Sequence, residues 1–181
     1  MTEQATTRRG GTTTRAAGVV IALGALATLA ACGDDEPTEP PPAPDAVTAY
    51  EQTRQDVLAA VQDVYGADGW TDDDGGATAT AQDDGRCVVF LPDARATPGG
   101  EDAYGLLADV PDAIAPVLDE HGFGEPSDVV EAEHGGSASV DATDPAGWSV
   151  RVTADGDLVR LDVSGPVDLD PCDEAGLPGL G

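Results

Sequence analysis

The chain has 181 residues, which is room for one domain of ordinary size, and its charge is strongly unbalanced. Acidic residues number 35 against eight basic ones, all of them arginine, and the formal net charge is −27. Because nucleic acids and anionic lipid headgroups are bound through clustered lysine and arginine, this balance excludes a nucleic-acid partner. It leaves a cationic partner, metal ions or general solubility as explanations of the acidity.

The first 31 residues have the pattern of a bacterial signal peptide. Residues 1–15 are polar and carry three arginines, and residues 16–31 are apolar and uncharged. Sixteen helical residues span about 24 Å, less than the roughly 30 Å of a hydrocarbon core, so a permanent transmembrane helix is the weaker alternative. The pair Arg8-Arg9 leaves twin-arginine export open beside the general route, although the apolar residues that usually follow such a pair are missing.

The apolar segment ends in Leu29-Ala30-Ala31-Cys32. These residues resemble the lipobox of bacterial lipoproteins, Leu-Ala-(Gly/Ala)-Cys, at all four positions. The resemblance implies that a diacylglycerol is attached to the Cys32 sulfur and that the signal peptide is cut off before this residue. Two or more acyl chains, palmitate among them, anchor a protein stably in a membrane. The alternative is an ordinary secretory signal with a chance cysteine.

Residues 32–45 are predicted to form a disordered, lipid-anchored tether. After the cysteine they read GDDEPTEPPPAPD, in which proline and acid dominate and nothing apolar can pack. The folded domain is expected over residues 46–173, and residues 174–181 are expected to form a flexible tail. Since only Glu3 among the acidic residues precedes Cys32, the processed chain keeps 34 acidic residues against five arginines, a net charge of −29.

A helix is predicted over residues 46–65, because its apolar residues recur at helical spacing. Asp45 is suited to be its N-cap and Gly66 to end it. The following segment up to Gly85 is polar and rich in turn residues, and a loop with at most one short strand is expected there. The apolar run 87–91 then predicts a strand buried on both faces, followed by a Gly- and Pro-rich loop.

A second helix is predicted over roughly residues 102–121. Pro111 and Pro116 interrupt its apolar pattern, because proline lacks the N–H that a helix interior needs. An alternative therefore stays open, in which residues 102–108 form a separate turn and Pro111 lies in the first turn of a helix capped by the residues before it. Gly122 is expected to end the helix.

The remainder is predicted to be β-structure. Strands are expected at residues 127–133 and 139–142, and Asp144-Pro145-Ala146-Gly147 has the pattern of a type I turn. A two-residue turn at Asp155-Gly156 then predicts a hairpin over residues 148–163. Its register pairs Val152 with Val159, Val150 with Leu161 and Trp148 with Val163, so that all six apolar residues share one face.

These elements predict an α+β domain: two helices packed on one face of an antiparallel sheet of four to five strands, in the order α-β-α-β-β-β. The core is expected to contain Tyr50, Val57, Val61, Val89, Leu118, Trp148, Val150 and Leu161.

With Cys32 lipidated, Cys87 and Cys172 remain, and a disulfide between them is predicted because the space outside the cytoplasmic membrane permits disulfides. It would close a loop of about 85 residues, worth roughly 4 kcal/mol by chain entropy. A buried pair of free thiols or a metal pair is the alternative, although there is no Cys-x-x-Cys and there are only two histidines.

No catalytic or cofactor motif is found, and we predict neither an enzyme nor a cofactor. Residues 72–75 are similar to part of a calcium-binding loop, but Trp70 and Ala81 would then occupy ligand positions, which excludes an EF-hand and leaves open weak, nonspecific calcium binding. His121, at a helix end, and His134, beside a turn, are interpreted as surface residues.

Arg151 and Arg160 are the candidate site. In the predicted register they lie directly opposite each other on the polar face of the hairpin, where like charges destabilise a sheet. One interpretation is that Asp162, with Glu131 or Glu133, neutralises them on a solvated face. The other is that the two arginines contact a small anion or carboxylate.

The sequence combines a lipobox and a tether with an early helix, a strand with Cys87, a helix ending in Leu118-Asp119-Glu120-His121-Gly122-Phe123, the strands of residues 148–163 and the late Cys172. In this combination the chain resembles a loose group of small actinobacterial lipoproteins of uncharacterised function, over most of residues 46–173. The resemblance implies the fold and the location, and leaves the activity open.

The leading functional hypothesis is a non-enzymatic binding or interaction module, held by lipid on the outer side of the cell membrane. Its partner would be an envelope protein or a small ligand of unknown specificity. A carrier of a small ligand or cation is the second hypothesis. A cell-wall enzyme is the third, but its catalytic residues cannot be named.

Overall fold

The computed structural model describes residues 39–72, 75–98 and 103–179. The predicted signal peptide, the predicted lipid attachment at Cys32 and the first part of the predicted tether lie outside these residues. The described chain is α+β, with helices and one antiparallel sheet of eight strands. The predicted class is thus confirmed, and the number of strands is larger than expected.

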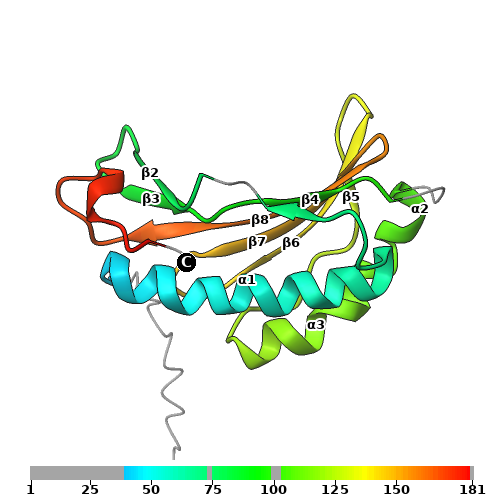
Figure 1. The fold of residues 1–181 in the computed structure, drawn as a ribbon, viewed down its shortest axis with the longest axis horizontal. Helices are drawn as coiled ribbons and strands as arrows, with labels where there is room; N and C mark the ends of the chain where they lie inside the picture. Colours follow the sequence, from blue (N-terminus) through cyan, green and yellow to red (C-terminus); the bar gives the residue numbers. More distant parts are fainter. Residues whose placement is uncertain (1–38, 73–74, 99–102, 180–181) are drawn as a thin grey trace, which may run out of the picture. The chain divides into compact units, whose positions relative to one another are not determined.

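Two longer helices lie on the same side of the sheet (Figure 1). They are α1, Ala43–Tyr65, and α3, Val110–Glu120, with the short α2, Ala103–Leu107, before α3. The predicted helix over 102–121 is therefore two helices, as the alternative allowed. Pro111 lies in the first turn of α3, where its missing N–H costs no helical hydrogen bond.

The start of α1 differs from the prediction. The helix begins three residues earlier, after Pro42, so that Asp45 lies in its first turn and does not cap it. The preceding prolines pair with the end of the sheet: the Asp168 N–H donates to the Pro41 carbonyl (2.8 Å), and the Ala43 N–H donates to the Asp168 carbonyl (3.3 Å). The last residues of the predicted tether thus belong to the folded domain, because their extended backbone finds partners there.

The end of α3 is a Schellman motif, which confirms Gly122 as the stop. Gly122 has a φ of +77°, and its N–H donates to the Asp119 carbonyl (3.1 Å). The Phe123 N–H donates to the Leu118 carbonyl (2.9 Å), and both of these side chains are buried. The glycine therefore returns the chain toward the core.

The sheet has the strand order β1-β4-β8-β7-β6-β5, with β3 paired to β8 and β2 paired to β3. The strands are β1 (Thr71–Asp72), β2 (Thr78–Ala81), β3 (Cys87–Phe90), β4 (Ala94–Ala96), β5 (Val130–Glu131), β6 (Ser137–Thr143), β7 (Ser149–Asp155) and β8 (Leu158–Val167). Three of them, β1, β2 and β4, lie in segments that were expected to be mainly loop. They were missed because they are short and contain no large apolar residue.

Two predicted strands are corrected. The strand with Cys87 is half-buried and not buried on both faces: Val89 is inaccessible, whereas Phe90 is 44% exposed on the other face. The strand predicted over 127–133 is reduced to β5, and the Ser127 N–H before it donates to the Asp141 carbonyl of β6 (2.8 Å).

The β7–β8 hairpin has the predicted faces but another register. Its turn residues are Gly156 and Asp157, with a φ of +61° at Gly156, and Asp155 pairs with Leu158. Every pair is therefore shifted by two residues, so that Val150 pairs with Val163. Because side chains alternate with a period of two, this shift leaves the apolar residues on the same face.

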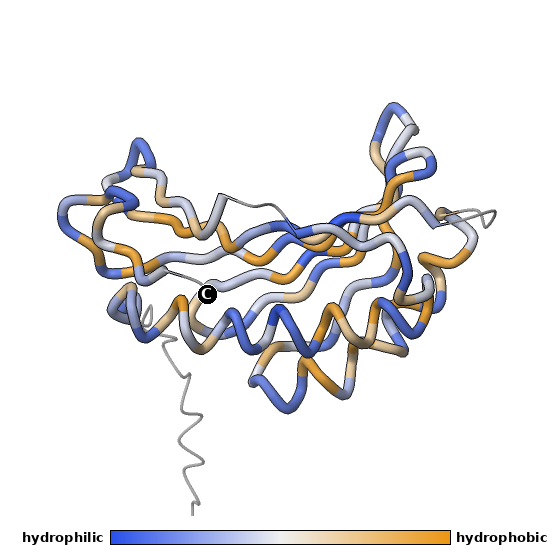
Figure 2. The backbone as a smooth tube through the Cα atoms, viewed as in Figure 1, coloured by the Kyte–Doolittle hydropathy of each residue, from blue (hydrophilic) through white to orange (hydrophobic). Residues whose placement is uncertain are grey.

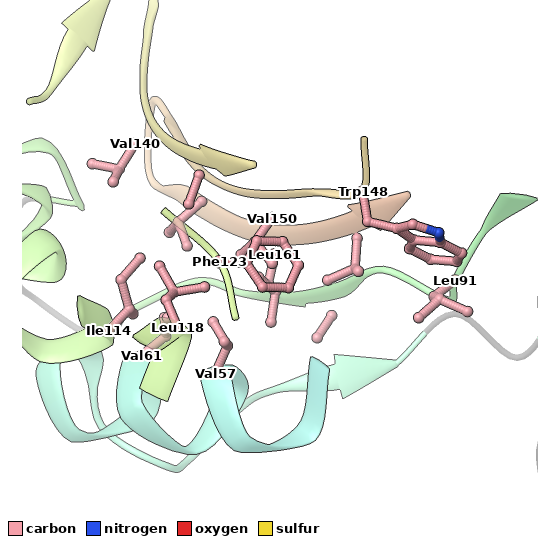
Figure 3. Packing of buried hydrophobic residues seen from close by; sticks show 14 of the residues in the cluster. Val57, Val61, Leu91, Ile114, Leu118, Phe123, Val140, Trp148, Val150 and Leu161 are labelled. Carbon is pink, nitrogen blue, oxygen red and sulfur yellow. The ribbon is translucent and has the colours of Figure 1, made fainter. Parts of the chain in front are cut away.

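The core lies between this face and the helices. Figure 3 shows Val57 and Val61 of α1 and Leu118 of α3 beneath the sheet residues Val150 and Leu161. Figure 2 shows the alternation of hydrophobic and hydrophilic residues along the strands that places one set inward. Of the eight predicted core residues, seven are buried; they are Val57, Val61, Val89, Leu118, Trp148, Val150 and Leu161. The eighth, Tyr50, is partly buried against them.

Cys87 and Cys172 form the predicted disulfide, with 5.6 Å between their Cα atoms and a sequence separation of 85. It joins β3 to the segment after β8. Beyond it, Glu174–Gly176 of the predicted tail form a short 3₁₀-helix, η1, in which the Asp173 side chain accepts a hydrogen bond from the Ala175 N–H (3.0 Å).

Candidate functional site

The sheet face opposite the helices, here called the open face, carries an ordered pattern of polar residues. One row runs across four strands, from Arg95 on β4 through Arg160 and Thr153 to Ser139 on β6. The next row places Arg151 between two aspartates, Asp162 on β8 and Asp141 on β6. Since paired residues of neighbouring strands point the same way, these side chains share the open face.

The prediction that Arg151 and Arg160 lie directly opposite each other is wrong. In the observed register Arg151 faces Asp162, and Arg160 faces Thr153. Arg160 on β8 does face another arginine, Arg95 on the neighbouring strand β4. That pair was not expected, because the strand that supplies Arg95 was itself missed.

Each arginine of the open face is bonded to an aspartate. The Arg151 Nε donates to Asp141, the Arg160 Nε donates to Asp162 (2.9 Å), and an Arg95 Nη donates to Asp93 (2.9 Å). All three arginine side chains are still substantially exposed, from 45% to 58%. These are three of the five arginines that follow Cys32.

Asp162 is the partner of Arg160 on the open face. Burial against the sheet raises the pKa of the Asp162 carboxyl, and the neighbouring Arg160 offsets part of that rise. The Asp162 carboxylate accepts a hydrogen bond from the Arg160 Nε (2.9 Å). It orients the guanidinium in return, through a charge-assisted hydrogen bond.

Arg151 and Arg160 nevertheless meet at one place. Both line a hollow of about 260 Å³ on the open face, beside β5. The other lining residues are Val130, Glu131, Ala132, Ser137, Ala138, Ser139 and Thr153. In the described part of the chain, no residue accepts a hydrogen bond from the Nη groups of the two arginines. The hollow thus combines free cationic donors with hydroxyl groups and small apolar surfaces.

A second cluster, on the helix side of the sheet, joins Asp144 to two predicted core residues, Tyr50 and Trp148; the part of Asp144 in it was not expected from the sequence. The Asp144 carboxylate accepts from the Tyr50 hydroxyl and from the Trp148 N–H (2.8 Å). The Tyr50 ring stacks on the Trp148 indole, with 3.9 Å between centroids and 5° between planes. Burial, then the bonded Asp144, raises the pKa of Tyr50 far above its ordinary value. Because both carboxylate oxygens are used, this cluster joins α1 to the sheet and offers no free group.

A buried arginine, Arg54, was also missed. It donates two hydrogen bonds to Glu51 (2.8 Å each) and one to Asp72 of β1 (3.0 Å), and only 5% of the residue is exposed. The i,i+3 spacing of Glu51 and Arg54 was the available signal. Asp72 belongs to the segment that is similar to a calcium loop, and Asp73 and Asp74 lie outside the described residues.

The histidines lie apart from the hollow. His121 is the C-cap of α3, and its Nε2 is 3.0 Å from an Asp56 carboxylate oxygen of α1. His134 is exposed in the turn after β5. Over residues 39–72, 75–98 and 103–179 no group of three or more His, Cys, Asp or Glu side chains is arranged to hold a metal ion.

The chain matches no family model, and no curated protein matches it significantly. A solved structure of a DUF4853 family protein from Actinomyces odontolyticus is similar with a TM-score of 0.44 and 11% identity, over 73% of this chain and 75% of that one. Among the helices in the described part of the chain, none combines the length and the apolarity that crossing a membrane requires.

Proposed function

We propose that this chain is a lipoprotein held by lipid on Cys32 at the outer side of the cell membrane, where it acts as a non-enzymatic binding module. The export pattern of residues 1–31 and the lipobox-like Leu29–Cys32 support the anchor. The disulfide between Cys87 and Cys172 supports the location, because disulfides persist in oxidising compartments and are rare in the cytosol. This bond is the observation on which the proposal chiefly rests.

The open face is the surface we assign to the partner. Its arginines and aspartates are ordered by mutual hydrogen bonds, and the face is concave at the hollow beside β5. By contrast, the acidic groups on the helix side that could serve chemistry are already bonded: Asp144 to Tyr50 and Trp148, and Asp56 to Gln52 and His121. This distribution supports binding over catalysis.

The folded end of the tether supports a partner close to the membrane. Glu39 is the first described residue, and Pro41 already pairs with Asp168. Glu39 lies seven positions after Cys32, and seven residue steps reach at most about 25 Å even when fully extended. A lipid on Cys32 would therefore keep the domain near the bilayer surface.

Metabolic labelling with an alkyne analogue of palmitate tests the anchor. We expect label on the natural chain and on a Cys87→Ser variant, and none on Cys32→Ser, which also leaves the membrane fraction. The Cys87→Ser variant is the matched control, since it removes a cysteine that is not lipidated. An unlabelled natural chain would refute the anchor.

Site-specific photo-crosslinking in living cells tests the surface. A crosslinker in place of Thr153 lies on the open face, and one in place of Gln55 lies on the exposed side of α1. We expect a defined membrane or wall adduct from position 153 that is absent from position 55 and is lost when Cys32→Ser is added. An adduct from position 55 alone would reject the open face as the binding surface.

A further inference from the structure

We propose that the hollow beside β5 binds a small monocarboxylate, held by the Nη groups of Arg151 and Arg160 and by the hydroxyls of Ser139 and Thr153. The inference rests on the proposal that the open face is the binding surface, and it names the class of ligand. It follows from how the arginines are held, from the charges beside them and from the size of the hollow.

The two arginines are positioned donors and not merely neutralised charges. Each guanidinium is fixed through its Nε, Arg151 by Asp141 and Arg160 by Asp162, while its Nη groups have no acceptor among the described residues. A guanidinium has five N–H donors, so a single bond at Nε leaves the pair that best matches a planar carboxylate. Fixing the side chain in advance also lowers the entropy lost on binding.

The hydroxyls lie where a second set of bonds is needed. Thr153 faces Arg160 directly, and Ser139 faces Thr153 on the next strand. Neighbouring strands are about 4.8 Å apart, so a carboxylate at the guanidinium groups is within reach of the Thr153 hydroxyl. The Ser139 hydroxyl donates to Asp141 (3.0 Å), so it is left as an acceptor for a donor group attached to the carboxylate.

The charges favour a monoanion over a phosphate. Asp141 and Asp162 lie one on either side of Arg151 in the same row, and Asp93 is bonded to Arg95 nearby. These carboxylates and the strongly acidic chain repel a dianion more than a monoanion, because the repulsion grows with the charge of the ligand. Glu131 also lines the hollow, so the three carboxylates already outnumber the two arginines, and a dianion would meet twice the repulsion of a monoanion.

The size and the rim of the hollow limit the group to which the ligand's carboxylate is attached. A volume of about 260 Å³ lies below the range of drug-sized ligand sites. Val130, which is 57% exposed, and Ala132 line the hollow on the side of β5. The carboxylate is therefore carried on a small, partly apolar group.

Saturation-transfer NMR on the full chain in detergent tests this assignment with three probes. N-acetylalanine carries a carboxylate on a small apolar group, N-acetylalaninamide has the same shape without the charge, and methyl phosphate is the dianionic competitor. We expect saturable binding of N-acetylalanine, and binding of the other two that is weaker by at least about tenfold. The amide offers the arginines no charged acceptor, and the flanking aspartates repel the dianion more strongly.

Matched variants locate the site. Arg151→Ala and Arg160→Ala should each weaken N-acetylalanine binding about tenfold or more. Arg86→Ala removes an equally exposed arginine that is bonded to Asp84 in the same way, outside the hollow, and should leave binding unchanged. Arg160→Lys keeps the charge without the planar fork and should bind less tightly than the natural chain.

Absence of N-acetylalanine binding, equal loss in the Arg86→Ala variant, or tighter binding of methyl phosphate would each overturn the assignment. Because the variants replace exposed side chains, a melting curve shows whether each one is folded before binding is measured. Labelling of Cys32 depends neither on these probes nor on any residue of the hollow. A failure of the ligand class is therefore distinguishable from a failure of the proposed function.

Discussion

Replacing Gly165 by alanine should destabilise the domain through Trp148. Gly165 lies in β8 beneath the indole, and a Cβ at this position would be 2.2 Å from the Trp148 Cγ and 2.3 Å from its Cδ2. Real atoms do not approach so closely, so the indole must move. It is the largest fully buried side chain, it stacks on Tyr50, and its Nε1 donates to the Pro166 carbonyl (3.1 Å).

The expected loss is the sum of three effects. Overpacking costs about 1–3 kcal/mol, a disrupted aromatic pair about 0.5–1.5 kcal/mol and a weakened hydrogen bond about 1 kcal/mol. Gly165→Ala should therefore lower the free energy of unfolding by about 2.5–5.5 kcal/mol. With a urea slope of about 2 kcal/mol per molar, the midpoint of unfolding falls by roughly 1.2–2.8 M. Urea titration followed by circular dichroism, with the disulfide intact, measures it.

Gly124→Ala is the matched control, because its new Cβ meets only the Thr143 carbonyl at an ordinary 3.4 Å and the backbone needs no positive φ. We expect its midpoint to be unchanged or slightly raised. In a Trp148→Ala background, which removes the clashing ring, Gly165→Ala should cost less than about 1 kcal/mol. If the two substitutions instead add without coupling, the indole is not the reason for the glycine.

Three further predictions concern stability. Cys172→Ser should lower the free energy of unfolding by up to about 4 kcal/mol, since a loop of 85 residues is released; a melting curve that is unchanged with and without reductant would contradict this. The free energy of unfolding should fall above about pH 10, because a tyrosine in the unfolded chain ionises there while the raised pKa keeps Tyr50 protonated in the fold. Tyr50→Phe should make this fall less steep, which urea titrations at several pH values measure. Arg54→Ala should lower the free energy of unfolding by about 2–4 kcal/mol in the same assay, because Glu51 keeps a largely buried charge without its partner. A loss no larger than that of Arg86→Ala would show that the pair of Arg54 and Glu51 does not stabilise the fold.

The elements that could be predicted from sequence are those with a strong local signal. The helix that contains Val57 and Val61 has an apolar stripe at helical spacing, and the stop at Gly122 is local backbone chemistry. The strands β1, β2 and β4 have no such signal, because Thr-Ala-Thr-Ala and Ala-Arg-Ala carry little apolar area of their own. They form because a partner strand is present: β4 pairs with the long β8, β1 pairs with β4, and β2 pairs with β3, which itself pairs with β8, so their formation is a tertiary effect.

The candidate site could be predicted only in part for the same reason. Arg151 and Arg160 stand out in the sequence because arginine is rare after Cys32 and both fall on the polar face of a hairpin. The hollow that they share also needs β5, whose two residues pair with Ser139 and Ala138 of β6. No sequence signal showed that β5 would lie beside these arginines.

The register of the hairpin shows which physical terms decide between two arrangements with identical faces. The predicted turn at Asp155-Gly156 requires a positive φ at both residues, whereas the observed turn begins at Gly156 and gives the positive φ to glycine. The predicted register opposes Arg151 to Arg160, and the observed one opposes Arg151 to Asp162. Opposite charges across a strand pair stabilise by about 0.2–1 kcal/mol and like charges destabilise by a similar amount. Burial is indifferent to a shift of two residues, so turn chemistry and charge decide. The guanidinium groups at the hollow are held by two other bonds, Arg151 to Asp141 on β6 and Arg160 to Asp162 on its own strand.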